Sequence, residues 1–115
     1  MITIFGIPNC DTVKKSRAWF DEQGIAYTFH DFKKLGVPGT AVDNWIKALG
    51  WEALVNKKGT TWRKLNAAEQ AAVVDAASAK ALMLAQPSVI KRPVVVAGTH
   101  ISVGYSPQDW IQVCK

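Results

Sequence analysis

The sequence predicts a mixed α/β (α+β) protein in which a small four-stranded sheet is interrupted by a helical segment. Strand, helix and strand patterns follow one another in the first 30 residues. No convincing strand occurs between about 36 and 87, and two further strand patterns and a helix pattern close the chain. With 115 residues, 49% of them hydrophobic, the chain can bury a real core. We expect one domain over 1–115, with a sheet-bearing core at about 1–35 and 88–115 and a helical insert at about 36–87.

The first third of the chain predicts a β-α-β unit. The apolar run at 2–5 is typical of a short buried strand, and residues 11–23 place apolar side chains on one helical face. Gly24 stands where a helix commonly ends in the left-handed conformation. Residues 25–30 alternate loosely and favour a second strand. Because the connections are short, we expect a right-handed crossover, with the two strands parallel.

The middle of the chain predicts helices and loops only. Its glycines and prolines mark turns, and polar residues before apolar runs are typical of helix starts. In order, we expect a loop at 36–39, a helix that starts with a capping box at 40–43 and ends at Gly50, a helical turn at 51–54, a polar loop at 56–61, a helix capped at 66–69 and a helix over 75–84.

The last third returns to the sheet. Residues 93–96 and 100–104 predict two strands joined by a short glycine-containing hairpin at 97–99. Ser106 and Pro107 are typical of an N-cap and a first helical position, so a closing helix should pack on the sheet. Without the insert, this order is a thioredoxin-like arrangement, with a four-stranded mixed sheet and helices on both sides.

Cys10 is the candidate nucleophile. It follows the first strand at the N-terminus of the first helix, where free amides and the helix dipole favour a thiolate. Lys14 and Arg17 would add positive charge on or near the same face. A buried structural cysteine is the alternative interpretation. Position 13 is Val, so no CxxC pair exists, and Cys114 is either an incidental thiol or a resolving partner.

The composition argues against several classes of protein. No run approaches the ~18 apolar residues of a membrane span, and the N-terminus does not begin as a signal peptide, so we expect a soluble cytoplasmic protein. His30 and His100 offer no zinc spacing, and we expect no metal and no tightly bound cofactor. The net charge of +5 is dispersed without an aromatic-interleaved basic stripe, which suits a small anionic substrate at least as well as nucleic acid.

Three motifs resemble the ArsC/Spx family: residues 4–16 around the Asn-Cys-Asp-Thr loop, residues 59–65 (Gly-Thr-Thr-Trp-Arg-Lys-Leu) and residues 90–96 (Ile-Lys-Arg-Pro-Val-Val-Val). The family comprises glutaredoxin-linked arsenate reductases, the Spx regulators and the YffB branch, regarded as glutathione-dependent thiol reductases. The chain is most similar to the YffB branch, and the resemblance spans essentially its whole length. It implies a thioredoxin-like fold and thiol chemistry.

Position by position, the resemblance makes Cys10 the catalytic cysteine. It makes Arg92 the anion-binding arginine and Pro93 the cis-proline, beside which a glutathione peptide would pair as an added strand. Asn9, Thr12 and Lys14 are further candidates for substrate binding, although helix capping or a solvated helix face would also explain them. Glutathione is the implied co-substrate and a glutaredoxin a further partner, and we expect a monomer.

Departures from the family pattern separate three functions. By the resemblance, arsenate reductases of this family have arginines at the positions of Asn56 and Tyr105. Neither Asn56 nor Tyr105 can replace the positively charged, bidentate hydrogen-bond donor that an arginine supplies. We therefore expect a glutathione-dependent thiol-disulfide oxidoreductase that uses one cysteine through a mixed disulfide. The alternatives are an Spx-like redox regulator that binds RNA polymerase and a true arsenate reductase. Val13 removes the cysteine pair that a redox switch in this loop would need.

Overall fold

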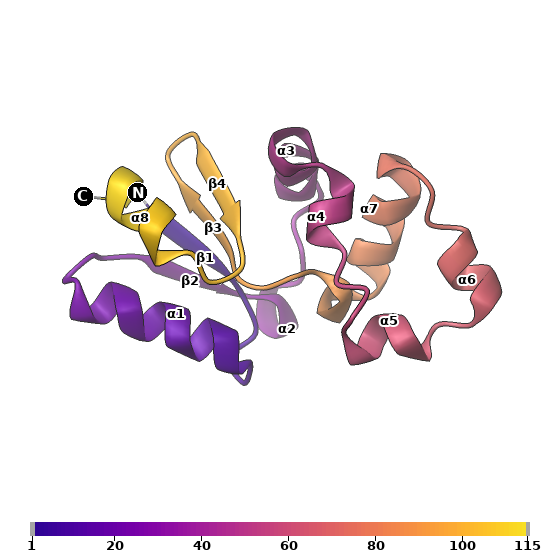
Figure 1. Ribbon diagram of the computed structural model, residues 1–115, viewed down its shortest axis with the longest axis horizontal. Helices are drawn as coiled ribbons and strands as arrows, with labels where there is room; N and C mark the ends of the chain where they lie inside the picture. Colours follow the sequence, from indigo (N-terminus) through magenta and orange to yellow (C-terminus); the bar gives the residue numbers. More distant parts are fainter. Residues whose placement is uncertain (1, 115) are drawn as a thin grey trace. The chain divides into compact units, whose positions relative to one another are not determined.

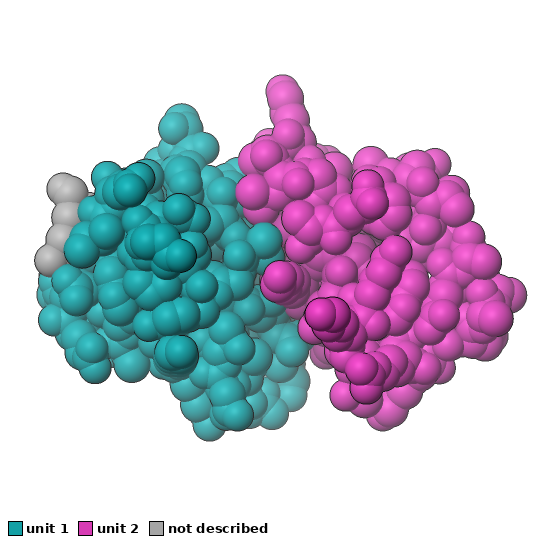
Figure 2. All heavy atoms as spheres, viewed as in Figure 1, with its two compact units in different colours: residues 1–35, 92–115 teal, residues 36–91 magenta. Residues whose placement is uncertain are grey.

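The computed structural model describes residues 2–114 and divides into two compact units. The sheet unit comprises residues 1–35 and 92–115, and the helical unit comprises residues 36–91 (Figure 2). Within the described residues, no helix is both long and apolar enough to cross a bilayer. We describe the two units in turn.

The sheet unit contains one mixed four-stranded sheet with the strand order β2-β1-β3-β4 (Figure 1). Strand β1 pairs in parallel with β2, which confirms the predicted β-α-β unit. It pairs antiparallel with β3 on its other side, and β3 and β4 form the predicted hairpin. The strand bounds are Ile2–Gly6 for β1, Thr28–Asp31 for β2, Val94–Ala97 for β3 and His100–Val103 for β4.

One face of the sheet packs against helices α1 (Asp11–Glu22) and α8 (Pro107–Cys114). Alternate side chains of a strand point to opposite faces. Ile4 and Val95, which are paired in register, therefore join Phe20 and Trp110 in one buried cluster. The Trp110 indole N–H donates to the Ser102 hydroxyl at 3.0 Å, which satisfies a polar group inside this core.

The other face of the sheet carries an aromatic cluster. The Phe5 ring lies 5.0 Å from His30, its register partner on β2, and 6.5 Å from Phe32. Phe32 is buried and begins the short helix α2 (Phe32–Leu35), which the sequence did not predict. Helices of the sheet unit thus contact both faces of the sheet, as expected for the thioredoxin-like arrangement.

The second strand is shorter than predicted at its start. Residues 25–27 were expected to belong to it, but β2 begins at Thr28. The amide of Ile25 donates to the Phe20 carbonyl at 3.0 Å after Gly24 has reversed the chain with a φ of +68°. This hydrogen bond closes α1 and delays pairing with β1, because it engages Ile25 in the helix end.

The helical unit is built around α3, α4 and α7, which pack on one another. Its fully or nearly fully buried side chains include Val42, Trp45, Leu54 and Met83. Five helices and a 3₁₀ turn make up the unit: α3 (Gly39–Leu49), α4 (Trp51–Leu54), α5 (Thr60–Lys64), α6 (Ala67–Ala71), α7 (Ala76–Ala85) and η1 (Pro87–Val89).

The helix starts of this unit confirm one prediction and correct two. Asn66 and Glu69 form the expected capping box of α6. The capping box predicted at 40–43 is wrong, because Pro38 is the N-cap of α3 and Thr40 already lies inside the helix. The polar loop predicted over 56–61 ends early, because α5 begins at Thr60. The short η1 turn was not predicted either.

Candidate active site

Cys10 lies at the N-cap of α1, directly after the loop that follows β1. Its backbone is extended (φ −99°, ψ 126°), and its carbonyl accepts from the Lys14 amide at 2.9 Å, the first bond of the helix. A side chain at the N-cap points toward the free amides of the first turn. The structure therefore confirms that Cys10 lies between a strand and a helix, as the sequence predicted.

Gly6 and Val13 determine how closely the strand approaches the helix. A Cβ atom on Gly6 would lie 2.8 Å from Cγ2 of Val13, closer than such contacts normally are. Val13 is fully buried, so it has little room to move. The end of β1 and the first turn of α1 are thus held together at a spacing that glycine permits.

Four influences act on the Cys10 thiol. Burial raises its pKa, but the Val13 amide, the Arg92 guanidinium (by both a hydrogen bond and its charge) and the Thr12 amide together bring the pKa below its ordinary value. Each of the last three stabilises the anion. Cys10 is half-buried and therefore not enclosed in the core. These surroundings favour the thiolate form of Cys10 more than those of a cysteine enclosed in an apolar core would.

Arg92 and Pro93 precede β3 and belong to the same unit as Cys10. The peptide bond between them is cis, as the family resemblance implied. The Pro93 carbonyl accepts from the Gly104 amide at 2.8 Å, which extends the β3–β4 hairpin to the start of this segment. The hairpin therefore anchors the segment that carries the guanidinium beside the Cys10 sulfur.

The positive charge beside the thiol comes from Arg92 and not from Arg17 or Lys14, which corrects the expectation from helix spacing. Arg17 donates to the Tyr27 hydroxyl at 3.2 Å and stacks on the Phe29 ring with 4.2 Å between its Cζ atom and the ring centroid. These contacts commit Arg17 to the packing between α1 and β2. Lys14 is exposed and lines a shallow depression of about 250 Å³ with Arg17 and Asp21. Its role in substrate binding stays a prediction.

Asn9 and Thr12 flank Cys10 in the loop and the first helical turn. Asn9 is exposed, and Thr12 is half-buried with its carbonyl accepting from the Ser16 hydroxyl at 2.7 Å. Thr12 contributes its amide to the thiol, a function that any non-proline residue supplies. Substrate contact by the Asn9 and Thr12 side chains stays a prediction.

The two positions that depart from the arsenate reductase pattern have local structural roles. The Tyr105 ring lies 4.2 Å from the Lys15 ammonium, measured to the ring centroid, and meets Trp110 edge-on at 5.5 Å. Asn56, in the helical unit, accepts from the Lys58 amide at 3.2 Å through its side-chain oxygen. Neither side chain offers a cationic donor.

Cys114 is a free thiol at the end of α8, as is Cys10 at the start of α1. Cys114 packs against the buried Ile4–Phe20–Val95–Trp110 cluster, and burial raises its pKa. Its surroundings thus favour the neutral thiol. Within residues 2–114, no group of three or more His, Cys, Asp or Glu side chains is arranged to hold a metal ion.

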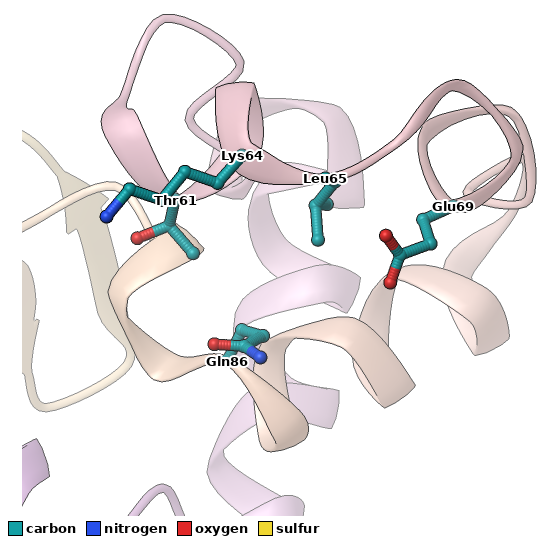
Figure 3. Close-up of a pocket in the computed structure, with 5 residues that line it drawn as sticks. All are labelled: Thr61, Lys64, Leu65, Glu69 and Gln86. Carbon is teal, nitrogen blue, oxygen red and sulfur yellow. The ribbon is translucent and has the colours of Figure 1, made fainter.

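The sequence indicated Cys10 and Arg92 as candidate site residues but did not indicate the pockets in the helical unit. One has a volume of about 410 Å³ and is lined by Thr61, Lys64, Leu65, Glu69 and Gln86 (Figure 3). Its two charged lining residues, Lys64 and Glu69, have opposite charges. The Glu69 carboxylate also accepts a hydrogen bond from the Asn66 amide in the capping box. A second pocket is rich in lysine and is described below. Neither pocket has a sequence signature, because the helices bring together residues that are distant in the chain.

Comparisons with known proteins found relatives of similar sequence and fold. A model of the ArsC family matches residues 5–113. The solved structure of a protein named YFFB is 43% identical, with both chains covered completely and a TM-score of 0.94. That of an arsenate reductase (ArsC) related protein from Brucella melitensis is 49% identical, covering 96% of this chain and 92% of that one, with a TM-score of 0.75. The global transcriptional regulator Spx of Staphylococcus saprophyticus is 22% identical over 95% of this chain and 83% of its own.

Proposed function

This chain belongs to the ArsC family, and on that premise we propose that it is a glutathione-dependent thiol-disulfide oxidoreductase with Cys10 as its single nucleophile. The observation that carries the proposal is the set of donors around the Cys10 sulfur. Two backbone amides and the Arg92 guanidinium lower the pKa of the thiol without a second cysteine in the loop. An activated lone thiolate suits exchange with an external thiol.

The reaction begins with attack of the Cys10 thiolate on one sulfur of a disulfide that includes glutathione. The S–S bond of the substrate breaks as the bond to Cys10 forms, and the departing thiolate takes up a proton from solvent. A second glutathione thiolate then attacks the mixed disulfide and releases Cys10 as a thiolate. In sum, one free glutathione thiol is oxidised and joins the glutathione of the substrate as glutathione disulfide, and the other half of the substrate leaves as a thiol. A glutaredoxin is an alternative donor for the second step.

The remaining candidate residues bind and orient the substrate in this proposal. Arg92 orients an anionic group of the substrate next to the sulfur, since its guanidinium already lies there. The backbone beside Pro93 offers a place where the glutathione peptide pairs as an added strand, although the Pro93 carbonyl already accepts from Gly104. Asn9, Thr12 and Lys14 border the thiol along the loop and the first turns of α1 and contact the bound peptide.

Incubation with oxidised glutathione followed by intact-mass measurement tests the assignment. We expect one glutathione adduct on the wild-type protein and on Cys114→Ser, and none on Cys10→Ser. Equal adduct formation by Cys10→Ser and the wild type would overturn the assignment of the nucleophile. The Cys114→Ser variant is the matched control, because it removes the other free thiol.

The similarity to Spx supports a second candidate function, a redox regulator that binds RNA polymerase. The fully buried Val13 opposes a disulfide switch in the loop, since it occupies the position that a second cysteine would need. A pull-down with RNA polymerase subunits separates the two functions: retention at low micromolar protein supports the regulator, and no retention supports the enzyme.

Arsenate reduction is the third function to be tested. A tetrahedral dianion requires several fixed cations, whereas Asn56 and Tyr105 supply none. We expect no arsenate turnover with glutathione and glutaredoxin beyond the rate of a Cys10→Ser control. A reducing compartment such as the cytoplasm fits the proposed chemistry, because it keeps the thiol free. The proposed reaction uses one cysteine, so a monomeric protein also fits it.

A further inference from the structure

A lysine-rich pocket of about 380 Å³ lies within the helical unit. Three of its lining residues are Lys57, Lys58 and Lys91, and the walls between them include Val55 and Ala53. Lys57 and Lys58 follow α4, whereas Lys91 ends the segment after η1. The pocket is thus formed by two segments that are more than 30 positions apart in the chain.

A short antiparallel pairing holds these segments together. Val55 and Ile90 form an isolated bridge. On either side of it, the Lys91 amide donates to the Leu54 carbonyl at 2.7 Å and the Asn56 amide donates to the Val89 carbonyl at 2.8 Å. Leu54, Val89 and Ile90 are fully buried. The backbone of Lys91, and that of Asn56 just before Lys57, is therefore tied to buried residues of the unit, which brings the two segments together.

The charges of the pocket are strongly unbalanced. Glu52 is its one acidic lining residue against three lysines. Within the part of the chain that the structure describes, none of these four side chains forms an ion pair. An excess of positive charge in one place costs folding free energy, which solvent screening reduces, and raises the local concentration of anions. A bound anion would offset this repulsion.

Lys57 is also positioned by aromatic rings. Its ammonium lies 5.5 Å from the Trp62 ring centroid and 5.9 Å from that of Trp51. Both rings are half-buried, so they form fixed walls beside the charge. A cation held against aromatic faces loses less freedom when it binds an anion.

From this arrangement we infer that the helical unit binds a small polyanion, a molecule with two or more phosphate or carboxylate groups, in the pocket of Lys57, Lys58 and Lys91. The volume suits a molecule of metabolite size, and the three ammonium groups recognise spread negative charge rather than one fixed geometry. The existence of this site does not depend on the proposed oxidoreductase activity.

Calorimetric titration with inorganic pyrophosphate and with citrate tests the inference and distinguishes phosphate from carboxylate ligands. We expect saturable 1:1 binding of at least one of them, weakened about fivefold for each lysine changed to Gln, as expected for loss of one contact charge near water. The triple variant Lys57→Gln/Lys58→Gln/Lys91→Gln should lose binding. Raising the ionic strength should weaken binding by the wild-type protein.

The matched control is Lys33→Gln/Lys34→Gln/Lys47→Gln, which removes the same net charge from exposed positions outside the pocket. It should bind like the wild type. Equal loss of binding in the two triple variants would show general attraction to a basic protein and overturn the inference, as would absence of binding by the wild type. Cys10→Ser should bind normally, so failure of this site and failure of the oxidoreductase proposal are distinguishable.

Discussion

The Arg92 guanidinium donates a hydrogen bond to the sulfur of Cys10, and its charge acts on the same atom. The two residues come from the two separate chain segments that form the sheet unit: Cys10 caps α1, and Arg92 precedes β3. The antiparallel pairing of β1 with β3 places the start of β3 beside the end of β1, with Phe5 opposite Val94. This register explains why an arginine so distant in sequence meets the thiol.

Replacing Arg92 should raise the pKa of Cys10 and slow its reactions. Arg92→Met keeps much of the side-chain volume but removes the hydrogen bond and the charge. A hydrogen bond to a charged group contributes about 1.5–3 kcal/mol, so alkylation of Cys10 by iodoacetamide at neutral pH should slow about tenfold or more. The pH profile of the alkylation rate measures the change.

Arg92→Lys is the control for this effect, because it retains the charge but not the planar donors. It should give a rate between those of the wild type and Arg92→Met. If all three proteins share one pH profile, Arg92 does not stabilise the thiolate.

The two cysteines should react in a defined order. The pKa of Cys10 is below its ordinary value, whereas burial raises the pKa of Cys114. At neutral pH and limiting iodoacetamide, peptide mapping should therefore find Cys10 labelled first. In 8 M urea the preference should disappear, because both differences depend on the fold. Preferential labelling of Cys114 in the native protein would contradict the site.

Ionisation of Cys10 should make stability depend on pH in a predictable sense. The folded state lowers the pKa of this thiol, so the thiolate adds stability that is complete above the ordinary thiol pKa. That stability is lost as the pH falls through the lower, folded-state pKa. Urea unfolding between pH 5 and 9 under reducing conditions should show this rise in the wild type and a smaller rise in Cys10→Ser. Identical curves would argue against a perturbed thiol.

Gly6→Ala should destabilise the contact between the end of β1 and the first turn of α1, which supports the site. The new Cβ would lie 2.8 Å from Cγ2 of the buried Val13, and overpacking of this kind costs about 1–3 kcal/mol. Because the Val13 amide also faces the thiol, the pKa of Cys10 should rise. Chemical unfolding and the alkylation profile measure the two effects.

The double variant Gly6→Ala/Val13→Ala tests the cause of that destabilisation. Removing the Val13 methyl groups relieves the clash, so the double variant should lose less stability than the sum of the two single variants. Simple additivity would show that Gly6 is needed for another reason.

Ser102→Ala should leave the buried Trp110 indole N–H without its acceptor. An unsatisfied buried donor costs about 1–3 kcal/mol, which urea unfolding can resolve. Ser106→Ala is the control, because its hydroxyl bond to Asp109 is exposed and should contribute less. A smaller loss for Ser102→Ala than for Ser106→Ala would contradict the role given to the buried pair.

Local patterns in the sequence were sufficient where the determinants were close together in the chain. The periodicity of 11–23 and the glycine that follows predicted α1 almost to the residue, and the Asn66–Glu69 capping box is present. The pattern at 40–43 misled, because Pro38 provides a start for α3 before the threonine. The start of β2 was also misplaced, since a single bond from Ile25 to Phe20 closes α1.

The amino-acid sequence was sufficient to predict that a helix begins at Cys10, that the loop of Cys10 lacks a second cysteine and that the chain contains the ArsC motifs. Each of these is a property of neighbouring residues. Helix spacing favoured Lys14 and Arg17 as the cations near the thiol, whereas the folded structure puts Arg92 there and shows which lysines share a pocket. Electrostatic interactions depend on the distance between charges in space, and strand pairing rather than spacing along the chain determines which side chains are close together.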